Sequence, residues 1–465
     1  MTTFKSVSSF GNLDRKSYKV EDSIAQIEKS KKGKNIIFGG KVSSDTNDDL
    51  IYIGKVSENC KGSDYFNYDT WLDTKFPHVI YITGARGSGK SFDLGVIIEG
   101  ISELNEKSNI NDNIEPITSI VIDTQSQFWT LGHKPKKNSR IPENEMQLEI
   151  LKKWNMKENS VKNIKIFIPP NTEKFLGTEE EITIRPKDVL TEDWCALFGQ
   201  EVYSPQGHII AMTLEYLDGS NYEIQDIINY ISDESNWDNE SEMSRNALTY
   251  KFDDYRRTNL FNSKGTKIED LLTKKTCHVL MLRDLRNEDK SLLTSILSRQ
   301  LFNKMGKMQT EKKKSAFLEK DYDGEDLPNK VWLFIDEAHV IAPNDAPSPG
   351  RKALREYVKR GRDAGLSLIL ATQQPSAIDS QILSQVNISI NHRLTFDSDI
   401  KAATNRLPSK EILSMSVNGQ NIKNFGDMIR LLEPGNSFIS DSGTSRSIMI
   451  QIRPRISAHG GYSPT

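Results

Sequence analysis

Hydrophobic residues fall into short, uninterrupted runs that alternate with stretches of helical spacing. Runs that are apolar along their whole length predict buried strands, and strands alternating with helices predict a parallel sheet covered on both faces. The sequence therefore indicates an α/β fold. Helices are predicted at Phe92–Leu104 and Leu292–Met305. The predicted strands are Val79–Ile82, Ile117–Ile122, Ile164–Ile168, His278–Leu282, Val331–Ile335, Leu366–Ala371, Ile388–Leu394 and Ser447–Ile452.

Two regions depart from this alternation. Short apolar runs between Asn35 and Asn67, separated by Gly, Asp and Asn, predict the strands of a small β unit. From about Thr178 to Thr276 the pattern is helical and polar, which predicts a helical insertion. The predicted division is an extension (1–34), a small β unit (35–72), a first core part (73–177), the helical insertion (178–276), a second core part (277–452) and a tail (453–465).

Charge and composition exclude several classes of protein. The 465 residues carry 61 Lys and Arg against 64 Asp and Glu, a net charge of −3, which excludes a generally basic nucleic-acid coat but allows a local basic ring. No apolar run reaches the ~18–20 residues of a membrane span, and Met1–Asn12 lacks a signal-peptide core. Three widely separated cysteines form neither a disulfide framework nor a zinc cluster, so we expect a cytoplasmic protein without a membrane partner.

The strongest chemical signal is the segment Gly84–Ser91, which reads Gly-Ala-Arg-Gly-Ser-Gly-Lys-Ser between a predicted strand and a predicted helix. It satisfies the phosphate-loop pattern Gly-x-x-x-x-Gly-Lys-Ser in the required context. The glycines let backbone N–H groups surround phosphate oxygens, and the helix start adds partial positive charge. Lys90 is expected to contact the β- and γ-phosphates, and the Ser91 hydroxyl to bind Mg²⁺.

A second signal is the pair Asp336-Glu337, which follows five apolar residues. A buried strand delivers such carboxylates to the carboxyl edge of the sheet, where ligands bind in open α/β folds. We expect Asp336 to hold Mg²⁺ through water and Glu337 to polarise the water that attacks the γ-phosphate. This arrangement indicates hydrolysis of the nucleotide.

Two further segments complete the predicted site. Gln373 follows the strand Leu366–Ala371, where its amide would sense the γ-phosphate. The helix Arg351–Arg362 carries Arg351, Arg355, Arg360 and Arg362, which form either a solvated basic face or an arginine finger projected into a neighbouring subunit. A glycine ends this helix just before Arg362, so we favour Arg362 as the finger, followed by Arg360.

Asp123 also ends a predicted buried strand. It would either support the Mg²⁺ shell or Lys90, or cap the turn that follows, and the sequence leaves both roles open.

The order of these motifs resembles the HerA branch of the HerA/FtsK group of P-loop ATPases. Segments beyond the phosphate loop contribute to this resemblance, namely the Asp123 strand, Val279–Leu285, Phe334–His339, Lys359–Arg362, Ala371–Ser376, Ile452–Arg455 and His459–Gly461. It implies a RecA-like P-loop core with a small amino-terminal β-barrel, a helical bundle and a tail that reaches a neighbouring subunit. It also implies a ring, typically a hexamer, with ATP between subunits and duplex DNA in the pore.

The resemblance assigns roles residue by residue. It implies a catalytic base at Glu337, a sensor at Gln373 and a finger in trans at Arg362. Mg²⁺ is assigned to Ser91 and Asp336. The expected nucleotide-binding residues are Gly84, Arg86, Gly87, Ser88, Gly89, Lys90, Ser91, Phe92 and Asp123.

The chain also departs from the family pattern. Family members usually follow the second strand with Pro-His-Gly-Glu-Tyr, whereas this chain reads Thr124–Phe128 as Thr-Gln-Ser-Gln-Phe, so the amide of Gln127 replaces a carboxylate. Such departures indicate a divergent member, of the kind associated with antiphage defence. Two functions follow: a ring motor that moves duplex DNA with an effector such as a nuclease or a NAD-consuming enzyme, or an ATP-controlled scaffold that activates such an effector with little translocation.

Overall fold

A computed structural model describes residues 17–20, 35–40, 49–60, 65–112, 115–137, 140–405, 407, 412, 414–417, 420–442 and 447–460. The run of lysines between 29 and 34, part of the expected extension, lies outside these residues. So does the end of the expected tail, after residue 460.

The described residues form one large sheet of 14 strands and a smaller one of four. In spatial order the large sheet consists of β10 (Glu180–Glu181), β9 (Ile164–Ile168), β11 (Cys277–Met281), β8 (Thr118–Asp123), β12 (Val331–Ile335), β13 (Leu366–Thr372), β6 (Val79–Thr83), β14 (Ile388–Asn391), β17 (Asn436–Asp441), β18 (Ile448–Ile452), β3 (Leu50–Val56), β5 (Asp69–Asp73) and β2 (Asn35–Phe38), and β7 (Asn111–Asp112) pairs with β3. The small sheet consists of β16 (Gln420–Ile422), β15 (Met415–Val417), β1 (Tyr18–Val20) and β4 (Glu58–Cys60).

The strands from β10 to β14 are parallel throughout, which confirms the expected mostly parallel α/β core. From β14 onward the pairing becomes antiparallel through β17, β18, β3 and β5. Strands of the expected small β unit therefore extend the same sheet that holds the phosphate loop. The division of the chain into domains stays a prediction.

The helices are α1 (Lys90–Ile101), α2 (Pro142–Lys153), α3 (Thr191–Leu197), α4 (Pro205–Leu217), α5 (Ile224–Ser232), α6 (Glu242–Arg257), α7 (Asn287–Phe317), α8 (Ala338–Ile341), α9 (Pro349–Arg360), α10 (Ser380–Leu383), α11 (Asp397–Thr404) and α12 (Phe425–Arg430). Two helices differ in length from the sequence expectation. Helix α7 continues well past Met305, into the charged stretch that follows, and α1 begins at Lys90 rather than Phe92.

The central strands bury both of their faces, which explains their uninterrupted apolar runs. Along β12, Trp332 and Phe334 pack into one hydrophobic cluster while Leu333 and Ile335 pack into another on the opposite face. This alternation is the period-two pattern of a strand covered on both sides. Helix α1 supplies residues to the first cluster, and helices α7 and α9 supply residues to the second.

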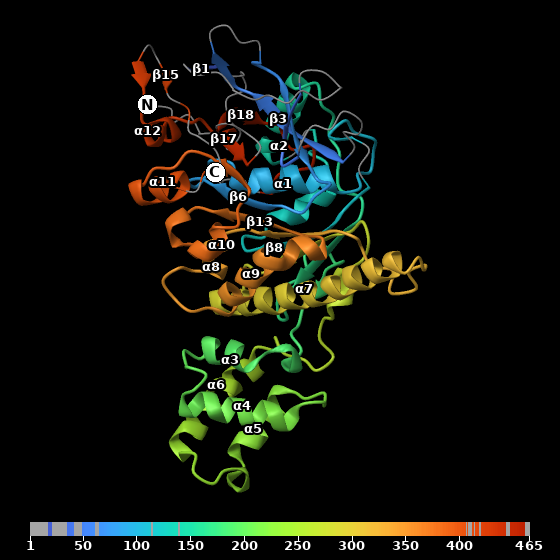
Figure 1. Ribbon diagram of the computed structural model, residues 1–465, viewed down its shortest axis with the longest axis vertical. Helices are drawn as coiled ribbons and strands as arrows, with labels where there is room; N and C mark the ends of the chain where they lie inside the picture. Colours follow the sequence, from blue (N-terminus) through green and yellow to red (C-terminus); the bar gives the residue numbers. More distant parts are fainter. Residues whose placement is uncertain are drawn as a thin grey trace.

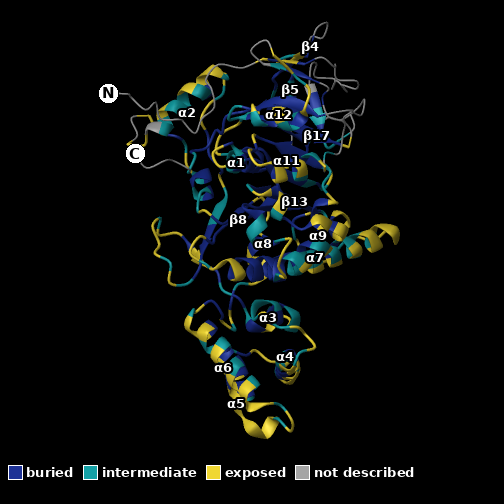
Figure 2. Cartoon of the chain, turned by 90° about the vertical axis from the view of Figure 1, so that its left-hand side faces the viewer, coloured by how far each residue is buried: buried dark blue, intermediate teal, exposed yellow. Residues whose placement is uncertain are grey.

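Helices α3 to α6 form a group at one end of the molecule, beyond the layer that contains α7 and α9 (Figure 1). Many of their residues are exposed, whereas the strands of the central sheet are buried (Figure 2). Their own core is aromatic, since the rings of Trp194 and Phe198 each contact those of Phe252 and Tyr255. No helix within the described ranges is long and apolar enough to cross a membrane.

Candidate active site

The phosphate loop connects β6 to α1 at the carboxyl edge of the parallel strands. Gly87 and Gly89 have φ values of 73° and 124°, a backbone region that glycine enters without strain. Gly89 is the last residue before α1, so the loop leads directly into the free N–H groups of the first helical turn. The exposed Arg86 and Gly87 form the tip of the loop.

A buried contact between His392 and Asp93 lies beside the loop. His392 follows β14, and its Nε2 lies 2.7 Å from Asp93 Oδ2 on α1 while its Nδ1 lies 3.1 Å from the carbonyl oxygen of Asn436. His392 therefore connects β14, α1 and the start of β17. A Cβ atom on Gly84 would approach the Cβ of His392 to 2.7 Å, so glycine is required there for close packing.

Lys90 places its ammonium group over the loop. Its Nζ donates to the carbonyl oxygen of Ala85 at 3.1 Å. Burial lowers the pKa of Lys90, and the nearby carboxylates of Glu337 and Asp336 oppose that shift. The lysine thus lies close to both the loop and two acids, and its contact with phosphate stays a prediction.

Asp336 follows β12 and is fully buried. Its Oδ2 lies 3.4 Å from Ser91 Oγ, and its Oδ1 accepts the backbone N–H of Glu337 at 3.1 Å. Burial, together with the charges of Glu337 and Asp123, raises the pKa of Asp336 to about 7 against the opposing effect of Lys90. A bound cation would therefore stabilise the charged form of this carboxylate.

These oxygens fit Mg²⁺. The described residues contain no cluster of three or more His, Cys, Asp or Glu side chains that would hold a metal by itself. Mg²⁺ usually takes only one or two protein oxygens and completes its shell with water and phosphate. The Ser91 hydroxyl and the Asp336 carboxylate could supply these protein oxygens.

Glu337 adopts a left-handed backbone conformation, with φ 49° and ψ 51°, at the start of α8. Such a conformation is uncommon for a residue other than glycine and directs the side chain toward the site. The Gln373 amide Nε2 donates to Glu337 Oε1. The other carboxylate oxygen lies 3.4 Å from His339 Nδ1, which also lies 3.1 Å from Thr372 Oγ1.

Asp123 takes one of the two roles that the sequence left open. Its Oδ2 accepts the backbone N–H of Phe128 at 2.8 Å, and its Oδ1 accepts that of Gln125 at 3.2 Å. Burial raises its pKa to about 6, while these backbone N–H groups oppose the shift. Asp123 therefore caps the turn after β8, and it adds negative charge beside Asp336.

The four candidate arginines differ in their surroundings. Arg355 forms an ion pair with Asp379, with a 3.0 Å contact from Nε to Oδ1, and Arg351 donates to backbone carbonyl oxygens of Pro343 and Asn344. Arg360 lies 3.6 Å from Glu356. Arg362 is exposed, and its guanidinium has no hydrogen bond or ion pair with any residue that the structure describes.

Arg362 lies at the edge of the sheet opposite the phosphate loop. It precedes β13, whereas Gln373 directly follows that strand. A hollow of about 850 Å³ at this amino edge is lined by Arg362, Lys359 and Lys75, together with His78, which precedes β6. Burial lowers the pKa of His78 to about 4. Within one chain the structure thus brings together all the predicted site residues except Arg362.

Sequence reasoning missed the supporting histidines. His339 lies in a segment that contributes to the family resemblance but has no role assigned by it, and His392 lies at the end of a predicted strand. Their roles depend on contacts with Glu337 and Asp93 from other elements, and no local spacing signals such contacts.

Parts of the chain are similar in sequence to known proteins. Residues 73–301 match the family model described as "Helicase HerA, central domain". The chain is 31% identical over 78 residues to "Probable helicase MJ1565" of Methanocaldococcus jannaschii, covering 17% of this chain and 15% of that protein. It is 29% identical over 73 residues to "DNA double-strand break repair helicase HerA" of Pyrococcus furiosus, covering 16% and 13%.

The aligned part thus spans about a seventh of the length of these curated relatives. Among solved structures, VirB4 of Thermoanaerobacter pseudethanolicus aligns with a TM-score of 0.49 at 13% identity, over 88% of this chain and 97% of that chain.

Proposed function

We propose that this chain, a divergent HerA-like P-loop ATPase, hydrolyses ATP with Mg²⁺ at the carboxyl edge of its sheet and uses the energy to move or remodel duplex DNA. The observation that carries the proposal is the convergence of Lys90, Ser91, Asp336, Glu337 and Gln373 from three neighbouring strands and their loops. Each of these groups has the charge or hydrogen-bonding capacity that transfer of a phosphoryl group to water requires.

Each residue has a defined task in the proposed reaction. Lys90 and the loop N–H groups bind the phosphates, and Ser91 and Asp336 hold Mg²⁺, which supplies neutralising charge when bound. Glu337 accepts a hydrogen bond from the attacking water and orients it. Gln373 donates to the same carboxylate. Its amide therefore couples the position of Glu337 to the presence of the γ-phosphate.

The position of Arg362 supports a shared site. β13 has seven residues, so it separates Arg362 from Gln373 by roughly 20 Å at ~3.3 Å per residue. A guanidinium so far from its own phosphate loop can act only on the loop of another chain. Head-to-tail contacts of this kind close into rings, and we propose a hexamer in accordance with the resemblance.

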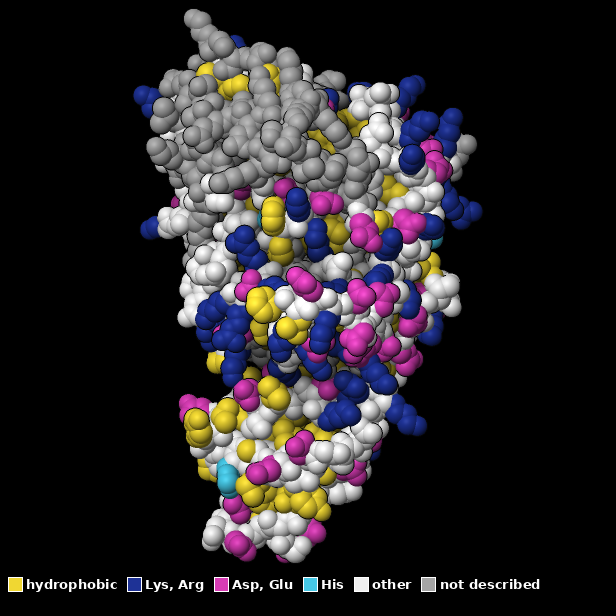
Figure 3. Space-filling view, turned by 45° about the vertical axis from the view of Figure 1, so that its right-hand side comes forward, with side chains coloured by type: hydrophobic (Ala, Val, Ile, Leu, Met, Phe, Trp, Pro, Cys, Tyr) yellow, Lys and Arg dark blue, Asp and Glu magenta, His cyan; other side chains and the backbone are white. Residues whose placement is uncertain are grey.

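The DNA-binding part of the proposal rests on local charge. Lys and Arg side chains gather across the middle of one face, with acidic side chains among them (Figure 3). Lys313 and Lys314 are exposed near the end of α7. A ring repeats a few cations in every subunit, and phosphate contacts dominate affinity for DNA. An effector partner and a role in antiphage defence, as well as a cytoplasmic location, complete the proposal.

The test is the rate of ATP hydrolysis with and without long duplex DNA. We expect DNA to stimulate the wild-type protein and to have no effect on Glu337→Gln, which keeps the shape of the side chain without its charge. Displacement of a protein block from the duplex should depend on the same residue. Hydrolysis that DNA leaves unchanged, together with activation of a partner in the Glu337→Gln variant, would contradict the motor and favour the scaffold.

A further inference from the structure

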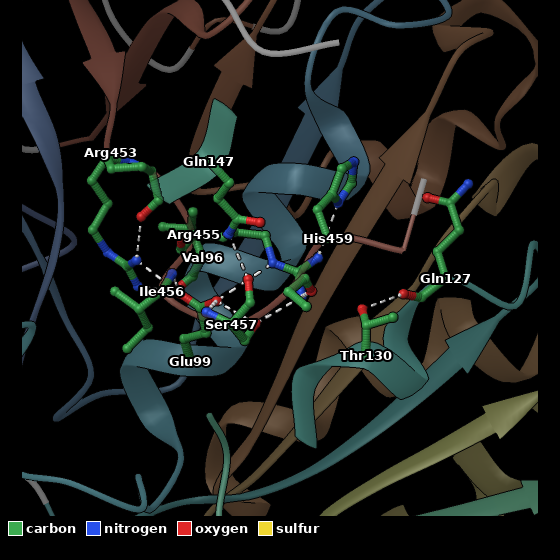
Figure 4. Close-up of polar contacts among 12 residues, drawn as sticks. Val96, Glu99, Gln127, Thr130, Gln147, Arg453, Arg455, Ile456, Ser457 and His459 are labelled. Atoms are coloured by element: carbon green, nitrogen blue, oxygen red, sulfur yellow. Dashed lines mark hydrogen bonds and ion pairs between the residues drawn. The ribbon is translucent and has the colours of Figure 1, made fainter. Parts of the chain in front are cut away.

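The segment 453–460, which follows the last strand of the large sheet, packs along one face of α1, the helix that begins at the phosphate loop (Figure 4). That face carries Phe92, Val96 and Glu99, which recur at helical spacing. Gly95 lies on it too, and a Cβ there would meet Arg455 Nε at 2.7 Å. The missing side chain at Gly95 lets the segment cross the helix closely.

Glu99 fixes the segment to the helix. Its buried carboxylate contacts Arg453 Nη1 at 2.8 Å and Arg455 Nε at 3.4 Å. It also accepts the backbone N–H groups of Ile456 and Ser457, at 3.1 and 2.9 Å. All three charged side chains are 0% exposed. A buried carboxylate with this many donors holds one geometry, because each unmade bond would leave a buried polar group unpaired.

From this fixed segment His459 reaches the first turn of α1. Its ring packs edge-to-face on Phe92, with centroids 5.5 Å apart. Arg455 Nη1 lies 3.2 Å from His459 Nδ1, and since a guanidinium only donates, that ring nitrogen must be the acceptor. Burial and the charge of Arg455 lower the pKa of His459 to about 3, so the ring is neutral at physiological pH. The adjoining Gly460 lies against the backbone of Gln127, which its Cβ would approach to 2.4 Å.

The direction of a bound nucleotide follows from the loop. Glu337 and Gln373 mark the end of the site where the γ-phosphate reacts, and Lys90 lies over the middle of the loop. The N–H of Phe92 belongs to the first helical turn, so it is available to the phosphate nearest the ribose. The ribose and base therefore leave the loop beside Phe92.

We propose that Phe92 and His459 form the wall on which the base of the bound nucleoside triphosphate stacks, so that segment 453–460 is part of the nucleotide site of its own chain. This inference rests on the proposed function. A neutral aromatic pair next to the phosphates offers a π-face to any base, so it supplies affinity more than discrimination among bases.

The experiment compares ATP with inorganic triphosphate, which carries the phosphates but no base. By calorimetry on the full chain with Mg²⁺, we expect His459→Ala to weaken ATP binding about tenfold and to leave inorganic triphosphate unchanged. His459→Phe, which keeps a ring, should retain the affinity for ATP. His133→Ala is the matched control, because it removes a similar edge-to-face pair with Trp129, at 5.7 Å, and should change neither ligand.

Equal losses for both ligands in His459→Ala, or unchanged ATP affinity, would overturn the stacking wall. If that variant is destabilised on heating, Phe92→Leu removes the ring from the other side, and the same split between ligands is expected. Lys90→Ala separates the two proposals. If it abolishes binding of both ligands while His459→Ala changes nothing, the proposed function survives and this inference fails. If neither ligand binds the wild-type protein, the proposed function fails.

Discussion

The two edges of the parallel sheet differ in how their charged residues are partnered. At the carboxyl edge, Lys90, Asp336 and Glu337 are buried and contact one another or the loop. At the amino edge, Arg362 is exposed beside an open hollow, and no described residue pairs with its guanidinium. Arg355, on the helix before it, shows the opposite case, because Asp379 already neutralises that guanidinium.

The difference supports our proposal that each edge is half of a site. The carboxyl edge carries the groups that we propose bind phosphates and orient water, and burial and neighbouring acids raise the pKa of Asp336 there. At the amino edge Arg362 forms no ion pair with a described residue, although Asp73 and Asp441 line the same hollow. If the amino edge of one chain stacked on the carboxyl edge of the next, the Arg362 guanidinium would lie beside the phosphates and acids of the neighbouring chain.

The largest effect on ATP binding is expected at Lys90. Lys90→Ala removes the ammonium group over the loop and should weaken ATP binding by about 100-fold or more, since contacts between charged groups are the strong ones. Calorimetry measures the affinity, and Lys152→Ala, on the exposed surface of α2, is the control. Unchanged binding in Lys90→Ala would show that the carboxyl edge does not bind the phosphates.

Arg362→Ala should leave ATP binding intact and lower turnover by about 10³–10⁵-fold, the range for an arginine that stabilises the transition state. Turnover should fall because the variant lacks the positive charge that Arg362 is proposed to place beside the phosphate loop of the neighbouring chain. Steady-state hydrolysis checks it, with Arg360→Ala as the control because Arg360 is also exposed but lies near Glu356. If Arg360→Ala lost turnover and Arg362→Ala did not, Arg360 and not Arg362 would be the arginine finger.

Glu337→Gln should keep ATP binding and lower turnover by about 10²–10⁴-fold, the usual contribution of a positioned base. A single-turnover assay separates this chemical step from product release. Weaker ATP binding with an unchanged rate of the chemical step would show that Glu337 binds the nucleotide and does not orient the attacking water.

The last effect concerns stability without Mg²⁺. Asp336 has a pKa of about 7 in the folded chain, above the ordinary value of 3.8, so the folded state binds the extra proton between those values. Stability should then fall as pH rises from about 4 to 7, by an amount on the order of 4 kcal/mol. Denaturant titrations in a chelator should show a smaller fall for Asp336→Asn, and parallel curves for the two proteins would contradict the assignment.

The sequence predicted the fold, and it predicted that the residues of the carboxyl edge lie together, because both depend on local patterns. Apolar runs located β6, β8, β12 and β13, and the glycine spacing located the phosphate loop. Asp336 and Glu337 were found because they end a strand whose partners are parallel, so all carboxyl ends meet at one edge.

Other features escaped because they depend on long-range contacts. The clamp of Glu99 by Arg453 and Arg455 joins residues more than 350 positions apart. Asp123 caps its turn by accepting the backbone N–H groups of Gln125 and Phe128. No sequence motif predicts the backbone conformation of that turn. The sequence favoured Arg362 because it follows a glycine, whereas the structure distinguishes it by its lack of a partner within the described residues.

Hydrolysis by mixed rings tests the shared site most directly. Glu337→Gln and Arg362→Ala chains, each inactive alone, are mixed in equal amounts, unfolded or dissociated, and reassembled. Where an Arg362→Ala chain offers its carboxyl edge to the Arg362 of a Glu337→Gln chain, the site is complete, so about a quarter of the interfaces should hydrolyse ATP. Turnover that stays at the level of either variant alone would show that Arg362 and Glu337 act within one chain, and would contradict a site shared between neighbours.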